Sequence, residues 1–247
     1  TQIGILRGSH IGNLTDLESA FEAEQPFFTQ DEFSYDIENP RQEVNHHLLK
    51  ASTKYIFSER AWAEMVYAKQ INTRKEFDVR RGDRNDKPAL SLDQESDFFE
   101  SKFHYYFENE WHLKSGIQFN RINNVNVPET GILPLFPNYL SIERGAFIMA
   151  TKAFKKLRIE VGARAEEENR KVASISNTVP REVLNFENTY LNYTATAGLQ
   201  YTFSERLSMN YNVGLAARNP EVNELYSNGL HQGVSGIEEG DINLSAE

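Results

Sequence analysis

The chain has 247 residues, no cysteine and a formal net charge of -10. The lack of cysteine excludes disulfides and thiolate metal sites, and the negative charge disfavours general binding to nucleic-acid phosphates. The mean hydropathy of -0.58 is typical of soluble proteins, but membrane β-barrels share it because their lipid-facing and lumen-facing residues alternate.

Apolar and polar side chains alternate along the first half of the chain, as in β-strands with one apolar face. A short strand is possible at residues 2–7, and a long polar segment follows at 11–41. The alternation then recurs at residues 49–57, 61–72, 99–107 and 111–120.

The second half has the same pattern more strongly, at residues 157–166, 191–204 and 206–218. A helix would place these apolar residues on all sides. Residues 142–154 are ambiguous because Phe147 and Met149 fall on the face that should be polar. We therefore predict four hairpins, or eight strands, with a possible ninth strand at residues 2–7.

The connections between these strands are unequal in length. Long polar segments occupy residues 80–94, 124–139 and 168–188. The other connections are short polar turns at Ser58-Glu59-Arg60, Glu108-Asn109-Glu110, Lys155-Lys156 and Ser204-Glu205-Arg206. Short periplasmic turns and long extracellular loops are the layout of an outer-membrane β-barrel.

Strand length favours the same class. The alternation lasts 10 to 14 residues, whereas strands of soluble sheets most often have about 5 to 6 and tilted membrane strands need about 9 to 11. Aromatic residues gather near the short turns, as an interfacial girdle requires; they are Tyr55, Phe57, Phe107, Trp111, Phe154, Tyr201 and Phe203. A soluble β-sandwich or propeller is the alternative.

The polar face of the predicted strands carries charges of both signs. A wet or plugged lumen accommodates such charges better than a dry core, although a small eight-stranded barrel could hold some as ion pairs. The inward charged residues are Lys50, Lys54, Glu64, Glu100, Lys102, Arg158, Glu160, Arg164, Glu166 and Arg218.

Two linked segments near the end of the chain resemble the TonB-dependent outer-membrane receptors. The first has the form Arg-x-Pro-x-x-x-Glu-Leu and contains Arg218, Pro220, Glu224 and Leu225. The second, which opens the next strand of that family, contains Gly240, Leu244 and Glu247. We interpret these seven residues as structural, with Pro220 ending the strand ladder and Arg218 pairing with Glu224 at the loop base.

The resemblance implies an all-β, antiparallel transmembrane β-barrel in the bacterial outer membrane. It implies uptake of a scarce ligand such as a ferric siderophore, driven by the TonB–ExbB–ExbD complex acting on a plug domain. We interpret residues 1–247 as the middle of such a barrel, of about 8–10 long strands, with the plug and the C-terminal strands lying outside this sequence. Outer-membrane lipid and lipopolysaccharide are expected neighbours.

Ligand contacts are expected in the predicted extracellular loops. Arg80, Arg81 and Arg84 cluster in one loop, and arginine suits bidentate binding of carboxylates in an anionic ferric complex. Tyr226 and His231 lie in another loop, and Phe136 and Tyr139 in a Pro-rich one. For the three arginines, a solvated loop or contact with lipopolysaccharide phosphates is the alternative.

Catalytic and cofactor signals are missing from the sequence. Residues 233–236 lack the second glycine of a nucleophile elbow, and residues 4–8 lack the Gly-Lys-Ser/Thr end of a phosphate loop. His46 and His47 would point to opposite faces of a strand, so we expect no metal site. We therefore expect a receptor without cofactor rather than an enzyme; a small adhesive barrel, or an importer of cobalamin, sugar or peptide, is the alternative.

Overall fold

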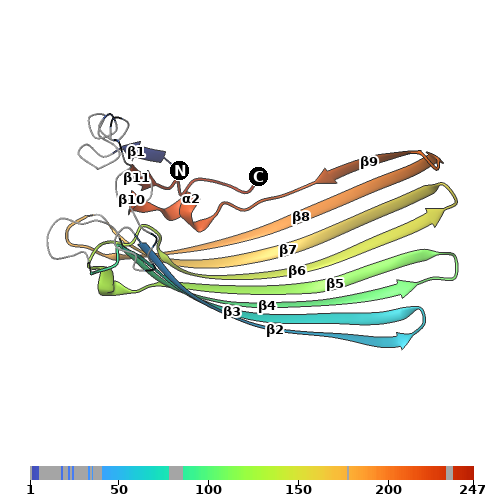
Figure 1. The fold of residues 1–247 in the computed structure, drawn as a ribbon, viewed down its shortest axis with the longest axis horizontal. Helices are drawn as coiled ribbons and strands as arrows, with labels where there is room; N and C mark the ends of the chain where they lie inside the picture. The colour runs from blue at the N-terminus through green and yellow to red at the C-terminus, as the bar shows by residue number, and fades with distance from the viewer. Residues whose placement is uncertain are drawn as a thin grey trace.

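The structure is a computed structural model in which the described residues are 2–5, 18, 22, 24, 33, 35, 41–77, 86–176, 178–231 and 236–247. Its main feature is one curved antiparallel sheet in which each strand pairs with the next along the chain (Figure 1). The strands, in order, are β2 (Arg41–Ser58), β3 (Ala61–Phe77), β4 (Leu90–Tyr106), β5 (Trp111–Asn126), β6 (Asn138–Phe154), β7 (Leu157–Ile175), β8 (Val183–Ser204) and β9 (Leu207–Leu215).

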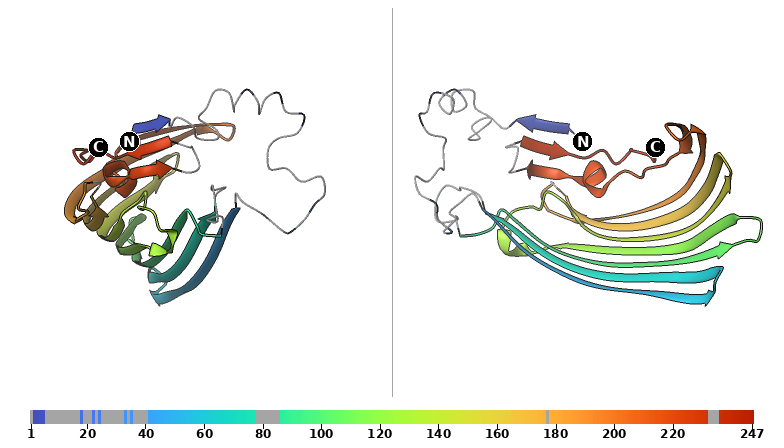
Figure 2. Two further views of the ribbon diagram at one scale, coloured as in Figure 1. Left: turned by 90° about the vertical axis from the view of Figure 1, so that its left-hand side faces the viewer. Right: turned by 45° about the vertical axis from the view of Figure 1, so that its right-hand side comes forward.

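The eight strands confirm the four predicted hairpins, and the possible ninth strand is present as well, but it does not belong to the large sheet. Residues Gln2–Ile5 form β1, which belongs to a separate three-stranded sheet with β10 (Asn228–His231) and β11 (Gly236–Glu239), in the order β1-β11-β10. This small sheet and the short helix α2 (Val222–Tyr226) lie near the long-loop end of the large sheet, on its concave side (Figure 2).

The large sheet is open among the described residues, since β2 and β9 are its edges and do not pair with each other. From the sequence alone, we expected such a sheet to curl into a narrow barrel or to pair its edges with a second copy. The observed curvature is that of a wide wall instead (Figure 2).

The register of the ladder shows that the strands are tilted. The first residue of β3, Ala61, pairs with Tyr105 of β4, which in turn pairs with Leu113 of β5. Since β5 begins at Trp111, this row of paired residues moves two residues along the strand while it crosses from β3 to β5. The same two-residue offset recurs at the next two hairpins, in the pairs Lys152↔Ile159 and Tyr201↔Met209. With about 3.3 Å per residue and about 4.8 Å between strands, this offset corresponds to a tilt of about 35°, which is that of an outer-membrane barrel.

The register also separates the two faces as the alternation predicted. One continuous row of pairs joins Ile148 to Ala163 and Ala195, and the row beside it joins Val161 to Ala197 and Val213. Large apolar side chains on this outer face are exposed, for example Leu191 at 60%. An apolar face of this extent requires lipid as its neighbour.

The aromatic residues beside the short turns lie on this outer face. Rings two residues apart pack edge to face, with centroids 4.8 Å apart for Tyr55 and Phe57 and 4.7 Å apart for Tyr201 and Phe203. Such a row near the turns matches the expected girdle at the periplasmic interface.

The strands extend further toward the long-loop side than the alternation indicated. They contain 16 to 22 residues from β2 to β8, and residues 168–175 and 183–188, which we expected in a loop, are strand. Beyond the apolar band neither face requires apolar side chains, so the period of 2 disappears while the backbone ladder continues. In contrast, β9 ends at Leu215, three residues before the predicted end at Arg218.

Glycines on the inner face make room for large side chains from neighbouring strands. A Cβ atom at Gly116 would lie 2.7 Å from the Phe147 ring and 2.6 Å from the Ser101 carbonyl oxygen. A Cβ atom at Gly145 would lie 2.7 Å from Arg164 Nη2. This packing explains why the alternation of residues 142–154 was ambiguous. The large apolar side chain of Phe147 lies on the inner face, where Gly116 leaves room for it.

Replacing Gly116 by alanine should destabilise the sheet by about 1–3 kcal/mol, because the added methyl overlaps a backbone oxygen and a ring. Urea-induced unfolding of the protein in lipid or detergent measures the change. Gly214→Ala is the matched control, since its Cβ would meet its nearest neighbour at an ordinary 3.6 Å. Equal stability of the two variants would contradict the packing described.

Candidate functional site

The segment after β9 turns away from the sheet and pairs with the end of the chain. Arg218 N donates to Glu247 O at 3.1 Å, and Glu247 N donates to Arg218 O at 2.9 Å. The Arg218 guanidinium also lies 2.9 Å from Glu224 Oε2 and 3.3 Å from Glu247 Oε1. The expected Arg218–Glu224 pair is therefore present, and Arg218 has left the β8–β9 ladder in which we had predicted it.

The remaining motif residues hold α2 against the chain end. A Cβ atom at Gly240 would lie 2.5 Å from the Leu225 carbonyl carbon, so only glycine allows this approach. Gly240 N donates to Ser227 O, and Asp241 N donates to Glu224 O, both at 2.8 Å. Leu225 is 1% exposed and forms a small core with Val222, Tyr226 and Val172.

A buried ion pair fastens this segment to the inner face of the sheet. Arg170, which is 4% exposed, donates to Glu168 Oε1 at 2.6 Å and to the Pro220 carbonyl oxygen at 2.6 Å. Glu168 also accepts hydrogen bonds from Ser141 at 2.7 Å and from Asn219 at 2.8 Å. These hydrogen bonds fix the segment across the inner face near the extracellular end.

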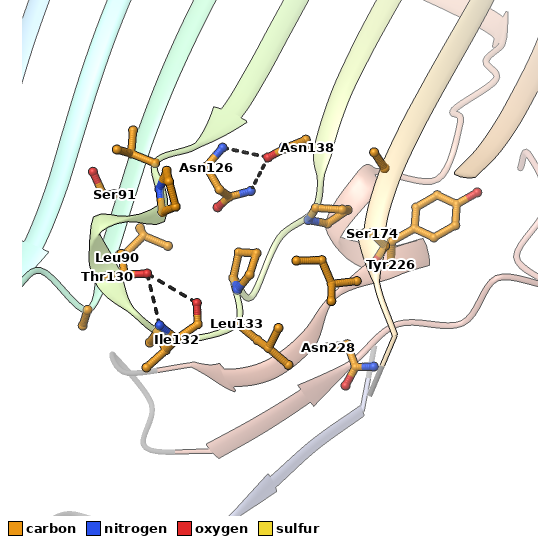
Figure 3. A pocket seen from close by; sticks show the side chains of 17 residues that line it. Leu90, Ser91, Asn126, Thr130, Ile132, Leu133, Asn138, Ser174, Tyr226 and Asn228 are labelled. Carbon is orange, nitrogen blue, oxygen red and sulfur yellow. Dashed lines mark hydrogen bonds between the residues drawn. The ribbon is translucent and has the colours of Figure 1, made fainter. Parts of the chain in front are cut away.

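A cavity of about 360 Å³ lies beside this segment, beneath the loop between β5 and β6 (Figure 3). Its lining comes from that loop, the start of β4, the end of β7, Tyr226 and Asn228, and it includes no charged side chain among the described residues. Most of the lining is apolar, and its polar residues are three asparagines and three hydroxyl-bearing residues, namely Asn126, Asn138, Asn228, Ser91, Thr130 and Ser174, besides Tyr226. Such a cavity suits an uncharged, mainly apolar part of a ligand.

Hydrogen bonds at three points hold the loop over the cavity. At its base, Asn126 Nδ2 donates to Phe136 O at 2.7 Å and to Asn138 Oδ1 at 2.8 Å. At its tip, Asn228 N donates to Leu135 O at 3.1 Å. On the far side, the 3-10 turn Pro128–Thr130 brings Glu129 within 2.8 Å of both Ser91 Oγ and Lys75 Nζ. The cavity is therefore preformed.

A second cavity of about 290 Å³ on the inner face is strongly polar. Its lining includes Glu143, Glu166, Glu168, Arg170 and Arg218. Beside it, Arg164 Nη1 donates to Gln118 at 2.8 Å, and the same guanidinium contacts Glu143 and Glu166. The charged inner face predicted from the alternation thus contains ion pairs, in the cluster of Arg164 with Glu143 and Glu166 and in separate pairs such as Lys54 with Glu64.

Hydrogen bonding lowers the pKa of two carboxyl groups that lie outside the membrane-spanning strands. The ammonium of Lys75 and the hydroxyl of Ser91 lower the pKa of Glu129. The backbone N–H of Glu221 and the guanidinium of Arg218 lower the pKa of Glu224. Both groups are charged at neutral pH, so the loop and the motif keep their ion pairs there.

The structure describes only part of the predicted ligand-contact set. Arg80, Arg81 and Arg84 lie outside the described residues, as does the side chain of His231. Tyr226 lines the apolar cavity, and its hydroxyl donates to Asn188 Oδ1 at 2.6 Å. Tyr139 lines the polar cavity.

Sequence reasoning pointed to the Pro-rich loop but missed the cavity beneath it. The cavity depends on residues from seven helices and strands and the loop between β5 and β6, and only their arrangement in space brings them together. Pro128, Pro134 and Pro137 were the available signal.

Among the described residues, no group of three or more His, Asp or Glu side chains is arranged to hold a metal ion. Within the same part of the chain, no helix is both long and apolar enough to cross a membrane.

A tilted antiparallel wall with a lipid-facing apolar side, a charged concave side and loops folded over one end defines the class of outer-membrane β-barrels. The chain belongs to the TonB-dependent receptor family: residues 7–247 match the model described as "TonB dependent receptor-like, beta-barrel". The family resides in the bacterial outer membrane and consists of transport receptors rather than enzymes. No curated protein sequence matches the chain.

Two solved structures share the fold. The first, titled "The crystal structure of the Ferric-Catecholate import receptor Fiu from E. coli K12: Open form", is 8% identical with a TM-score of 0.56, and the alignment covers 74% of this chain and 36% of that one. The second, "Copper transporter OprC", is 14% identical with a TM-score of 0.59, covering 76% and 33%. The match therefore spans about a third of each receptor.

Replacing Arg170 by methionine should cost about 3–5 kcal/mol, because the buried carboxylate of Glu168 would lose its charged partner. The change should also release residues 216–228 from the inner face, which hydrogen–deuterium exchange measures. Arg158→Met is the control, since the Arg158 side chain is 58% exposed and lies 3.8 Å from Glu160. Unchanged exchange at residues 216–228 in the Arg170 variant would refute the anchoring role.

Proposed function

We propose that this chain forms part of the wall of a receptor that takes up a scarce ligand across the outer membrane, energised by the TonB–ExbB–ExbD complex through a plug domain. The single observation that carries the proposal is the family match over residues 7–247. The charged inner face supports it, because a wall that lines a plugged lumen must interact with polar protein surface and water.

We propose a ferric siderophore or a ferric citrate-like complex as the ligand. Arg80, Arg81 and Arg84 would supply cations to the anionic part of such a complex. The uncharged cavity would take an apolar part of the same molecule, and Tyr226 lines it. His231 follows Tyr226 closely in the chain and is a further candidate for contact with the ligand.

The nature of the cargo needs a direct test, because the two structural relatives are named for different ones, a ferric catecholate and copper. Cobalamin, sugar and peptide ligands are the other candidates. A small closed adhesive barrel is disfavoured by the open, wide curvature of the eight-stranded sheet.

Tryptophan fluorescence of the full-length protein in detergent tests the proposal, with ferric dicitrate, other ferric siderophores, cobalamin, copper and free ferric ion as titrants. We expect saturable binding of one ferric complex. Combined Arg80→Ala and Arg81→Ala substitution should weaken it at least about tenfold, which is a loss of about 1.4 kcal/mol. Ile132→Asp, which places a charge in the apolar cavity, should weaken it similarly.

Arg206→Ala is the control, because Arg206 lies in a short turn at the opposite end of the sheet. If only cobalamin or only copper binds, that compound is the ligand and the ferric complex is rejected. If none of the titrants binds, the result argues against uptake of all of them. Weakening by the arginine substitutions without any effect of Ile132→Asp would remove the cavity from the site.

A further inference from the structure

Two histidines meet on the inner face of the sheet, beside the short turn between β4 and β5. His104 is the third residue from the end of β4, and His112 is the second residue of β5. His104 Nδ1 lies 3.1 Å from His112 Nε2, which is a hydrogen-bonding distance. Since a neutral imidazole has one N–H group and one acceptor nitrogen, the two rings share a single proton along this line.

Flat rings cover both histidines. The indole of Trp62 is stacked on the His104 ring, with centroids 4.6 Å apart and 7° between the planes. The phenol of Tyr106 is stacked on the His112 ring, with centroids 4.3 Å apart and 13° between the planes. Because His104 is only 9% exposed, the bond between the imidazoles is largely shielded from water. We call Trp62, His104, Tyr106 and His112 the paired-histidine cluster.

One carboxylate lies close to the pair. Glu64 Oε2 is 3.9 Å from His104 Nε2, and Glu64 Oε1 accepts a hydrogen bond from Trp62 Nε1 at 3.1 Å. His104 Nε2 is buried and has no hydrogen-bond partner among the described residues. A first added proton on this nitrogen would face the carboxylate and would leave the bond between His104 and His112 intact.

Cations surround the cluster on the neighbouring strands. They are Lys54 on β2, Lys102 on β4, Lys114 on β5 and Arg158 on β7. Carboxylates pair with three of these cations; they are Glu64, Glu100 and Glu160. On β6, the uncharged Thr151 is opposite His112 in the register and donates to Glu160 at 3.3 Å. Only Glu64 lies within ion-pair distance of either imidazole in the described part of the chain, so a second proton on the pair would be opposed by the cations.

We propose that the paired-histidine cluster is a proton-sensitive switch, in which the two imidazoles stay joined until both are protonated and then separate. Two protonated rings would direct N–H groups at each other across 3.1 Å, and each would carry a positive charge. Histidine changes its charge between about pH 8 and 5, so acidification of the periplasm would cross this transition. Separation would break the stack of Trp62 on His104 and loosen the β4–β5 hairpin at its turn. The proposal is independent of the cargo and of the proposed uptake.

Two measurements on the full-length protein in detergent test the switch, each made at about pH 7.5 and pH 5. Fluorine NMR of protein labelled with 5-fluorotryptophan follows Trp62, whose resonance is identified by its loss in Trp62→Phe. Hydrogen–deuterium exchange, corrected for the intrinsic effect of pH, follows residues 104–112. We expect acid to shift the Trp62 resonance reversibly and to accelerate exchange in the hairpin.

The variant His104→Phe keeps a flat ring against Trp62 but cannot be protonated, so both acid responses should be lost. His112→Phe should likewise lose the faster exchange. His46→Phe is the matched control, because His46 also lies on the inner face but is hydrogen-bonded to Asn72, at 3.1 Å, rather than to a second histidine. It should respond to acid as the unaltered protein does.

Exchange of residues 104–112 at pH 7.5 shows whether each variant keeps the hairpin folded, and the single variants at His104 and His112 serve as alternatives to each other. The proposal is overturned if the unaltered protein shows no acid response in either measurement. It is also overturned if His104→Phe or His112→Phe retains the faster exchange of the hairpin in acid.

Discussion

The constraint on which the structure depends is that every backbone N–H and C=O group inside a lipid bilayer needs a partner within the protein. The ladder from β2 to β9 meets this constraint by pairing each strand with the next along the chain. The tilt of about 35°, the short turns and the separation of an apolar face from a charged one are all consequences of this sheet crossing the membrane obliquely. Among the described residues, β2 and β9 are the two edges of this sheet.

The two faces of the wall have different packing requirements. Lipid accepts any apolar side chain, so the outer face needs only hydrophobicity and a boundary of aromatic and charged residues. The inner face must fit ion pairs and rings together at fixed distances, which is why Gly116 and Gly145 lie beside Phe147 and Arg164. The buried Glu168–Arg170 pair extends this network to the segment that folds over the extracellular end.

The sequence predicted those parts of the fold that depend on alternation and failed where the alternation stops. Residues 168–175 and 183–188 are strand although each face mixes apolar and polar side chains, because the ladder needs no regular alternation above the membrane. Arg218 left the ladder because Glu224 and Glu247 offer it partners that a strand neighbour does not. The cavity beneath the β5–β6 loop could not be predicted, since its lining combines residues distant in the sequence.

The central claim is that alternate residues of one strand face lipid and lumen, and the absence of cysteine makes it directly testable. Single cysteines at residues 194 to 197 of β8 would carry a nitroxide label, and electron paramagnetic resonance would measure its exposure to lipid-dissolved oxygen. We predict high exposure for Ala195→Cys and Ala197→Cys and low exposure for Thr194→Cys and Thr196→Cys. Equal exposure at all four positions, or a helical period, would contradict the account.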